Sequence, residues 1–242
     1  MNVFSKTYDI GIGEVDKNLC YRPYCVLHNM QDAATIHSEI LGFSRDQMIE
    51  KCGGVFILTK LFYKLFRPVK YREELTVNTW HRGLKGLLWN RDFEFFASGE
   101  HVGIASTAWV ILNPKTKRIL RPREFAHLEF PSFGKSVEDF EMPKTAIDMP
   151  DDGAKEFVVR YSQIDVNSHV NNTRYIEMCQ DALGAQAFEN RYVKCAAVSY
   201  QKELCCDEKY NVFIKKQGGE IYFLAKAEQE NKFEAMMELA DI

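Results

Sequence analysis

Hydrophobic positions in the first half of the chain follow one helical stretch and then several strands. Between Leu27 and Leu41 the apolar residues recur at helical spacing, and Gly42 stands where a left-handed C-terminal residue would end the helix. A short extended segment, Tyr8–Ile12, precedes it. Segments dense in aromatic and β-branched residues predict strands at Val55–Phe66, Leu75–Trp80, Leu88–Phe96 and His101–Leu112.

The periodic pattern stops between Pro122 and Gly153, where prolines alternate with acidic residues. We therefore expect a surface connector at residues 126–153, between an N-terminal domain of residues 1–125 and a C-terminal domain of residues 154–242. The same order of elements then returns. Its predicted members are the extended segment Phe157–Tyr161, the helix Val170–Leu183, and the strands Cys195–Leu204, Lys209–Lys215, Glu220–Ala227 and Lys232–Leu239.

Repetition of the element order indicates a duplicated domain. A faint sequence echo agrees with it, because Glu14–Cys20 parallels Gln163–His169. Tyr71–Val77 likewise parallels Cys206–Val212. One apolar helix wrapped by a curved antiparallel sheet is the hotdog layout. The predicted fold class is therefore α+β, a double hotdog whose two tandem domains pack side by side as a pseudo-dimer.

Composition is that of a globular protein. Hydrophobic residues make up 46% and charged residues 27% of the 242 positions, enough apolar residues to build a core and to exclude a disordered chain. With 31 Lys and Arg against 34 Asp and Glu, the net charge of -3 gives no overall field that would attract nucleic acid. No apolar run reaches the roughly 18 residues of a membrane helix, so we expect no membrane span.

The seven cysteines are scattered, and the adjacent pair Cys205 and Cys206 suits neither a strain-free disulfide nor a zinc site. We read them as reduced thiols of a cytoplasmic protein, in agreement with an N-terminus that has no signal-peptide pattern. No histidine pairs with another His or a Cys at ligand spacing. We therefore predict neither a metal site nor a cofactor.

The string Asp165–Asn172 concentrates polar side chains where a predicted strand meets the second predicted helix. One interpretation is structural, since Asp and Asn form turns and cap helices. His169 adds a chemical interpretation. An imidazole beside Asp165 and Asn167 at the positive end of a helix combines an acid/base group with a site for an oxyanion.

This string resembles the D-x-N-x-H-V-N-N motif of the plant acyl-acyl carrier protein thioesterases. The matching residues are Asp165, Asn167, His169, Val170, Asn171 and Asn172. The Tyr-x-x-Glu-Cys segment of that family, with its further catalytic carboxylate, is matched by Tyr200–Glu203, but Leu204 stands where the plant enzymes have cysteine. Matches in the first half are Trp80–Gly86, Trp89–Asp92, Ala108–Asn113 and Arg118.

The resemblance covers about Tyr8 to Leu239. It implies a thioester hydrolase that releases free fatty acid from acyl-acyl carrier protein in fatty acid biosynthesis. The plant enzymes have a transit peptide, and its absence here indicates a bacterial-type relative.

The catalytic residues carried over from the family are Asp165, Asn167, His169 and Glu203. Leu204 cannot act as a nucleophile, so we expect direct attack by water. Backbone amides at the start of the Val170 helix, with Asn167, would receive the oxyanion, and Glu203 or His169 would activate the water. The structural alternative for Glu203 is a strand carboxylate that faces solvent or pairs with Lys202.

In the first half, the echo places Cys20 at the position of His169 and Pro68 at that of Glu203, so this half is expected to shape the pocket only. We predict an acyl tunnel along the first helix, and simple core packing is the alternative. The predicted lining residues are Met30, Ala33, Ala34 and His37.

A local basic run follows the last predicted strand of the first half. It comprises Lys115, Lys117, Arg118, Arg121 and Arg123. Such a run is usually a solvated loop. The functional interpretation is a dock for the acidic carrier protein, the expected partner, through local charge complementarity.

Three other functions are weighed against this one. An acyl-coenzyme A thioesterase would share the fold and the chemistry. A hotdog dehydratase or hydratase would also pair His with an acidic residue, but would not need this motif. A non-enzymatic acyl-binding protein would need none of the four polar residues. The oligomeric state, monomer or homodimer, is left open.

Overall fold

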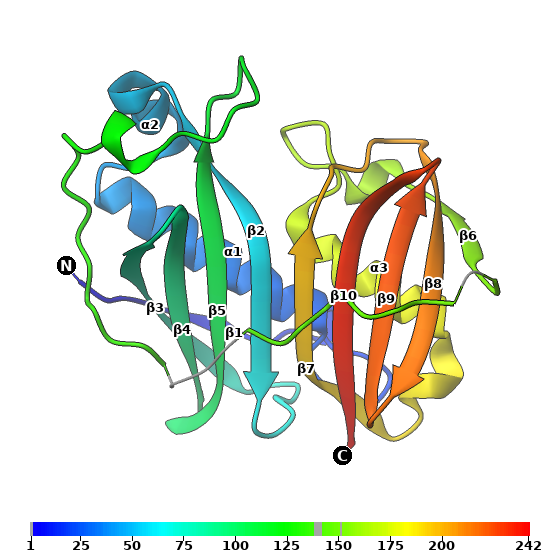
Figure 1. The fold of residues 1–242 in the computed structure, drawn as a ribbon. Helices are drawn as coiled ribbons and strands as arrows, with labels where there is room; N and C mark the ends of the chain where they lie inside the picture. The colour runs from blue at the N-terminus through cyan, green and yellow to red at the C-terminus, as the bar shows by residue number, and fades with distance from the viewer. Residues whose placement is uncertain (1, 138–141, 151) are drawn as a thin grey trace.

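The computed structural model describes residues 2–137, 142–150 and 152–242, and its strands form one continuous antiparallel sheet (Figure 1). Those of the first half are β1 (Phe4–Asp9), β2 (Val55–Leu65), β3 (Glu74–Lys85), β4 (Leu88–Ala97) and β5 (Glu100–Leu112). Those of the second half are β6 (Lys155–Val158), β7 (Arg191–Tyr200), β8 (Lys209–Gln217), β9 (Glu220–Ala227) and β10 (Glu230–Asp241).

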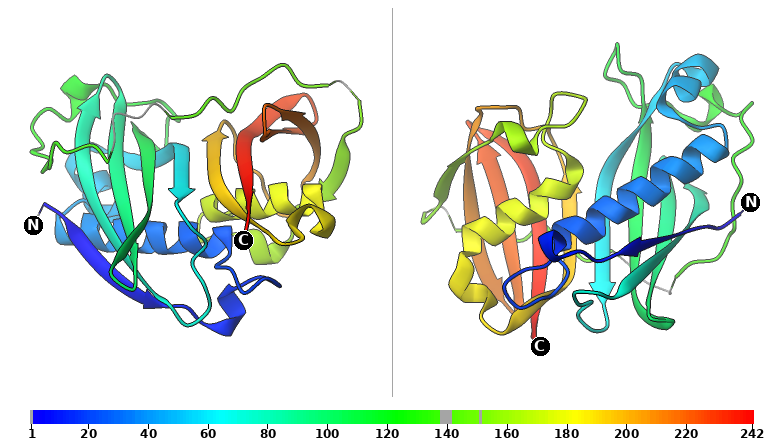
Figure 2. Two further views of the ribbon diagram at one scale, coloured as in Figure 1. Left: turned by 90° about the horizontal axis from the view of Figure 1, so that it is seen from below. Right: turned by 180° about the vertical axis from the view of Figure 1, so that it is seen from behind.

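The two halves join in the middle of the sheet. The strand order is β1-β3-β4-β5-β2-β7-β10-β9-β8-β6, so β2 and β7 pair across the boundary, from Lys60 opposite Ser199 to Lys64 opposite Cys195. Helices α1 (Pro23–Ile40) and α3 (Tyr175–Leu183) lie on one face of the sheet, one behind each half (Figure 2). The predicted double hotdog is therefore confirmed.

The apolar core lies between these helices and the sheet. Met30 and Ala33 of α1 and Ile176 and Cys179 of α3 are all at most 1% exposed. They belong to one cluster that runs through both halves. Burial of this shared apolar surface is what holds the two helices to the sheet.

Helix boundaries differ from the predictions at the N-terminal ends. Helix α1 begins at Pro23, ahead of the predicted Leu27, because proline is tolerated in the first turn, where its missing N–H has no partner to lose. A second helix, α2 (Arg45–Cys52), was not predicted. Ser44 and Gln47 form its capping box, and Gly53 ends it in a left-handed conformation. That S-x-x-Q pattern was a readable signal.

The helix predicted from Val170 begins only at Tyr175, after a 3₁₀ turn at Asn172–Arg174. Asn171 causes the delay, because its side chain accepts hydrogen bonds from the N–H and the hydroxyl of Thr173, at 3.0 and 2.7 Å. His169 and Val170, just before it, form isolated β-bridges with Cys205 and Ile164. Asparagine thus caps this helix from inside the predicted range.

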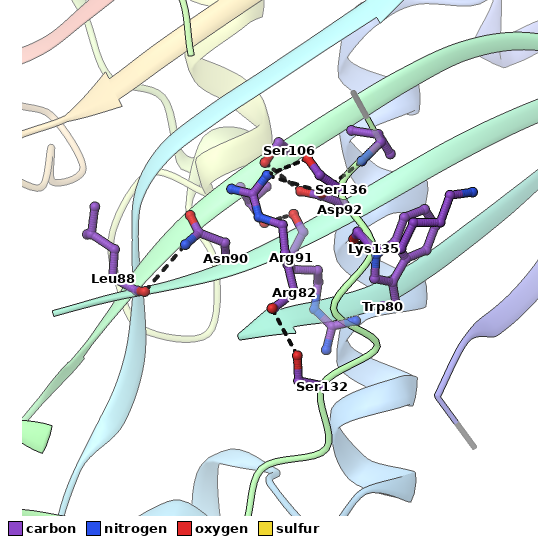
Figure 3. Close-up of polar contacts among 12 residues, drawn as sticks. Trp80, Arg82, Leu88, Asn90, Arg91, Asp92, Ser106, Ser132, Lys135 and Ser136 are labelled. Atoms are coloured by element: carbon purple, nitrogen blue, oxygen red, sulfur yellow. Dashed lines mark hydrogen bonds and ion pairs between the residues drawn. The ribbon is translucent and has the colours of Figure 1, made fainter. Parts of the chain in front are cut away.

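The described residues of the predicted connector, 126–137, 142–150 and 152–153, contain no helix or strand. The segment crosses the face of the sheet opposite to the helices (Figures 1 and 2). Met142, Ile147 and Met149 pack there on a small apolar cluster of the sheet. Its first part is hydrogen-bonded to β3, where the carbonyl of Lys135 accepts from Trp80 Nε1 at 2.7 Å (Figure 3).

No described helix is both long and apolar enough to cross a bilayer.

Candidate active site

A cavity of about 1360 Å³ lies where the two halves meet on the helix side of the sheet. The second half contributes the loop at residues 165–170 and the segment at residues 200–203 that follows β7. The first half contributes the exposed flank of α1 and the starts of β2 and β4. Concave sites between two domains are typical places for ligands.

The loop that carries the motif is fixed by its own hydrogen bonds. Asp165 Oδ1 accepts from the N–H of Asn167 at 2.8 Å, and the Asp165 N–H donates to the carbonyl of His169 at 2.8 Å. Ser168 adopts a left-handed φ of 65° to close the turn. Asp165 Oδ2 also accepts a long hydrogen bond, 3.4 Å, from the side-chain amide of Asn167. Asp165 therefore orients Asn167.

Backbone pairing brings His169 to Glu203. The N–H of Val170 donates to the carbonyl of Leu204 at 2.8 Å, so the motif loop runs antiparallel to the segment after β7. His169 Nδ1 then lies 4.0 Å from Glu203 Oε1, with the side chains 33% and 60% exposed. All four predicted catalytic residues, Asp165, Asn167, His169 and Glu203, line the cavity.

The side chains after Glu203 alternate between the cavity and the core. Leu204 is wholly buried in the core, whereas Cys205 lines the cavity beside Glu203. Residues 204 and 205 thus point to opposite sides, as neighbouring residues of an extended segment do. Lys232, which the sequence reasoning missed, supports this segment: its Nζ donates to the carbonyl of Glu203 at 3.2 Å and lies 2.7 Å from Glu208 Oε1.

Two of the backbone amides predicted to receive the oxyanion, those of Val170 and Asn171, are already paired within the protein. The N–H groups of Val170 and Asn171 donate to the carbonyls of Leu204 and Gln163, each at 2.8 Å, and are not free for a substrate. Regular helix starts at Tyr175, beyond both residues. Asn167, the other predicted donor, lines the cavity, and its side-chain amide has two N–H groups and gives one to Asp165.

The first half repeats the motif loop without its chemistry. Asp16 Oδ1 accepts from the N–H of Asn18 at 2.8 Å, as Asp165 does from Asn167. Cys20 pairs with Lys70 as His169 pairs with Cys205, which places Cys20 at the position of His169. The Lys70 Nζ lies 3.2 Å from the Cys20 Sγ, and burial raises the pKa of this thiol.

Helix α1 faces the cavity with a different stripe from the predicted one. Of the four predicted tunnel residues, only Ala34 is among the described lining residues; Met30 and Ala33 point into the core, and the His37 ring stacks on Phe4. The residues of α1 that line the cavity are Gln31, Ala34, Thr35, Ser38 and Glu39. The two stripes are neighbours on the helix. The prediction was based on apolar residues and therefore chose the stripe that packs against the sheet.

The basic run lies next to the cavity, and Lys117 lines it. Arg118 is neutralised by Glu124, whose carboxylate accepts from Nη1 and Nη2 at 2.9 and 2.6 Å. Arg118 holds the pKa of Glu124 down at about 2. The other four cations of this run are exposed, and no carboxylate of the described residues forms an ion pair with them. They are Lys115, Lys117, Arg121 and Arg123.

Within the described residues, no group of three or more His, Cys, Asp or Glu side chains is arranged to hold a metal ion.

Two family models match the chain. The model of the acyl-ACP thioesterase N-terminal domain matches residues 1–126, and that of the acyl-ACP thioesterase C-terminal domain matches residues 148–240. A palmitoyl-acyl carrier protein thioesterase of Cuphea hookeriana is 25% identical over 214 residues, which are 83% of this chain and 52% of that protein. The chain thus spans about half the length of the curated relatives it matches.

Two solved structures have the same fold along their whole length. A 12:0-ACP thioesterase from Umbellularia californica superposes with a TM-score of 0.84 at 19% identity, covering 99% of this chain and 98% of the other. An acyl-ACP thioesterase from Bacteroides thetaiotaomicron gives a TM-score of 0.81 at 19% identity, with 98% of each chain covered.

Proposed function

Because this chain belongs to the acyl-ACP thioesterase family, we propose that it hydrolyses the thioester of an acyl-acyl carrier protein and releases free fatty acid. The observation that carries the proposal is the convergence of His169 and Glu203 at a large cavity, with their atoms 4.0 Å apart. These groups are the acid/base pair that activation of water requires.

The proposed nucleophile is a water molecule between these two residues. A separation of 4.0 Å is too long for a direct hydrogen bond and leaves room for a water that contacts both groups. Glu203 accepts the proton of this water while its oxygen bonds to the carbonyl carbon. The C–S bond then breaks, and the departing thiolate takes up the proton that Glu203 accepted, which gives a carboxylic acid and a free thiol and restores the Glu203 carboxylate.

The negative charge that develops on the carbonyl oxygen needs a donor in the cavity. We assign this role to the Asn167 side chain, held by Asp165 as described above. His169 orients the same water through Nδ1, which lies 4.0 Å from Glu203 Oε1. A covalent acyl-enzyme at position 204 is not part of the proposal, because the Leu204 side chain is buried in the core and has no nucleophilic atom.

Acyl-coenzyme A is the second candidate substrate, since the same chemistry would cleave it. The basic run is the surface proposed to contact the acidic carrier protein, because Lys117 lines the cavity and the other unpaired cations of the run lie next to it in the chain. We further propose that the enzyme works in the cytoplasm, where its free thiols, including the exposed Cys205 and Cys206, stay reduced.

A panel of thioesters tests the proposal. Carrier-linked and coenzyme A-linked acyl chains of matched length are assayed for thiol release by the wild type and by Glu203→Ala. We expect the higher kcat/KM with the carrier and a loss of about 100-fold or more in kcat in the variant. Unchanged hydrolysis in the variant would refute the assigned carboxylate. Binding of acyl chains without hydrolysis of any thioester would favour a binding protein, and hydration of an enoyl thioester would favour a hydratase.

A further inference from the structure

Arg91 of β4 is a buried cation in the wall of the cavity. It is 2% exposed, and no described carboxylate forms an ion pair with it. Its Nη1 donates to His37 Nδ1 and Thr79 Oγ1, both at 3.1 Å, and its Nη2 donates to Ser38 Oγ at 3.1 Å and His81 Nε2 at 2.6 Å. A charge buried among neutral acceptors is costly unless something offsets it.

The neighbouring aspartate does not offset this charge. Asp92 faces the opposite side of the sheet, where its carboxylate accepts from Ser106 Oγ at 2.7 Å and lies 3.4 Å from Arg82 Nη1 (Figure 3). Burial lowers the pKa of Arg91 only to about 9, so the guanidinium stays charged at neutral pH. The cavity wall therefore carries a fixed positive charge.

His81 adds a donor without an acceptor. Burial and the adjacent Arg91 lower the pKa of His81 to about 2, so its ring is neutral. Since Nε2 accepts from Arg91, the single ring proton belongs on Nδ1. Nδ1 is buried and has no hydrogen-bond partner among the described residues, and His81 lines the cavity.

Trp89 supplies a second such donor. It lies two residues from Arg91 on the same face of β4, lines the cavity, and is 7% exposed. Its indole Nε1 is also buried without a partner. The other cavity-lining tryptophan differs, because Trp109 Nε1 donates to Thr107 Oγ1 at 2.8 Å. Buried donors without acceptors are rare in proteins and costly.

We infer that this arm of the cavity binds an oxygen atom carried by the distal part of the acyl chain, as a hydroxyl, oxo or carboxylate group. Such an oxygen accepts a hydrogen bond from His81 or from Trp89, beside the Arg91 guanidinium. A plain hydrocarbon would leave both N–H groups unpaired. The polar stripe of α1, Gln31, Thr35 and Ser38, is equally unsuited to an all-hydrocarbon chain. The inference rests on the proposed thioesterase function and names its substrate class.

The position of the arm sets the length of the chain. Arg91 is paired in the sheet with Thr107 of β5. Thr107 is paired in turn with Leu61 of β2, and Leu61 with Val198 of β7. Three strand spacings of about 4.8 Å place Arg91 about 14 Å from the strand that leads to Glu203. Glu203 lies five residues beyond Val198 along the chain, so about 14 Å is a lower limit for the distance to the thioester. An extended chain advances about 3.5 Å for three bonds, so the oxygen is expected at least about twelve bonds from the thioester.

The test compares carrier-linked acyl chains of equal length that end in a methyl, a hydroxyl or a carboxylate, over a range of lengths around twelve bonds. We expect an oxygenated chain to have a kcat/KM at least about tenfold above that of its plain counterpart. Equal or faster hydrolysis of the plain chains at every length would overturn this inference and leave the thioesterase function standing. Hydrolysis of no chain would refute the thioesterase function itself.

Two matched variants locate the effect. Trp89→Phe removes a donor that has no acceptor, whereas Trp109→Phe removes one that is already paired inside the protein. We expect Trp89→Phe to reduce the preference for the oxygenated chain about fivefold or more, and Trp109→Phe to keep it. Binding of the free acid products can be measured as a rise in Tm. The difference in this rise between the oxygenated and the plain acid should fall in Trp89→Phe and persist in Trp109→Phe. An equal effect of both variants on the preference would contradict the assigned site.

Discussion

His169 Nδ1 lies 4.0 Å from Glu203 Oε1 because two separate segments of the second half pair through their backbones. The hydrogen bond from the Val170 N–H to the Leu204 carbonyl, 2.8 Å long, fixes that pairing. Neither side chain is held by the other, so each has a free lone pair or N–H for a substrate water. The backbone pairing therefore positions the two residues, and their side chains are left for the reaction. Substitution of either side chain can test its role without breaking that pairing.

Glu203→Gln keeps the size of the side chain and removes its charge. We expect kcat to fall about 100-fold or more, because the amide cannot accept the proton of water. Glu230→Gln is the matched control, since Glu230 also lines the cavity but forms an ion pair with Lys202. Steady-state kinetics with a carrier-linked substrate gives both values. A similar kcat in Glu203→Gln and in Glu230→Gln would contradict the role of Glu203.

The duplicated loops allow one substitution to be made in two contexts. Asn167→Ala removes the proposed oxyanion donor, and we expect kcat to fall about 100-fold with little change in the free energy of unfolding, because Asn167 is exposed. Asn18→Ala should do the opposite. Its side-chain amide donates to the carbonyls of Phe188 and Arg191, at 2.9 and 3.1 Å, and so ties the first loop to the second half.

For Asn18→Ala we expect a loss of about 1–3 kcal/mol in the free energy of unfolding and an unchanged kcat. Urea denaturation and steady-state kinetics on the same preparations separate the two effects. Stability losses of equal size in both variants, without a selective fall in kcat for Asn167→Ala, would show that the second loop is purely structural.

The sheet and the duplication could be predicted because strand periodicity and element order are local signals. The start of α3 could not be predicted. Val170 fits a helical pattern, but its N–H pairs with the carbonyl of Leu204, a residue distant in sequence. The site residues were found from a motif, yet the direction in which the N–H groups of Val170 and Asn171 point depends on that tertiary pairing. Sequence therefore indicated residues that the structure brings to one cavity, but not that the N–H groups of Val170 and Asn171 are already paired.

The cavity wall was harder to predict for a different reason. Adjacent stripes of one helix differ by a single residue in register, so hydrophobicity selected Met30 and Ala33 of the core-facing stripe and passed over Thr35 and Ser38. The burial of Arg91 could not be predicted either, because a charged residue of an antiparallel strand can equally face solvent. Its side chain is buried because α1 packs on that face, with His37 and Ser38 hydrogen-bonded to the guanidinium.

The basic run can be tested by charge reversal at one exposed residue. Lys115→Glu should raise the KM for a carrier-linked substrate several-fold at low salt, with a smaller effect at high salt, because exposed charges act through a screened field. A small thioester without the carrier should be hydrolysed as by the wild type. Lys216→Glu, on exposed β8 of the other half, is the control. If Lys115→Glu impairs both substrates equally, the run is not a carrier dock.

The low pKa of His81 predicts how stability depends on pH. Its folded-state value of about 2 lies below the ordinary value of about 6.5, so the unfolded chain binds the extra proton between these limits. Stability from this group is therefore complete above pH 6.5 and falls on acidification, by about 1.4 kcal/mol for each pH unit. His81→Gln keeps an acceptor for Arg91 and removes the titration, while the adjacent His37 is present in both proteins. Between pH 6.5 and pH 5 we expect the free energy of unfolding, measured with urea, to fall by about 2 kcal/mol more in the wild type than in the variant. Equal losses in the two proteins would mean that His81 takes up its proton without destabilising the fold.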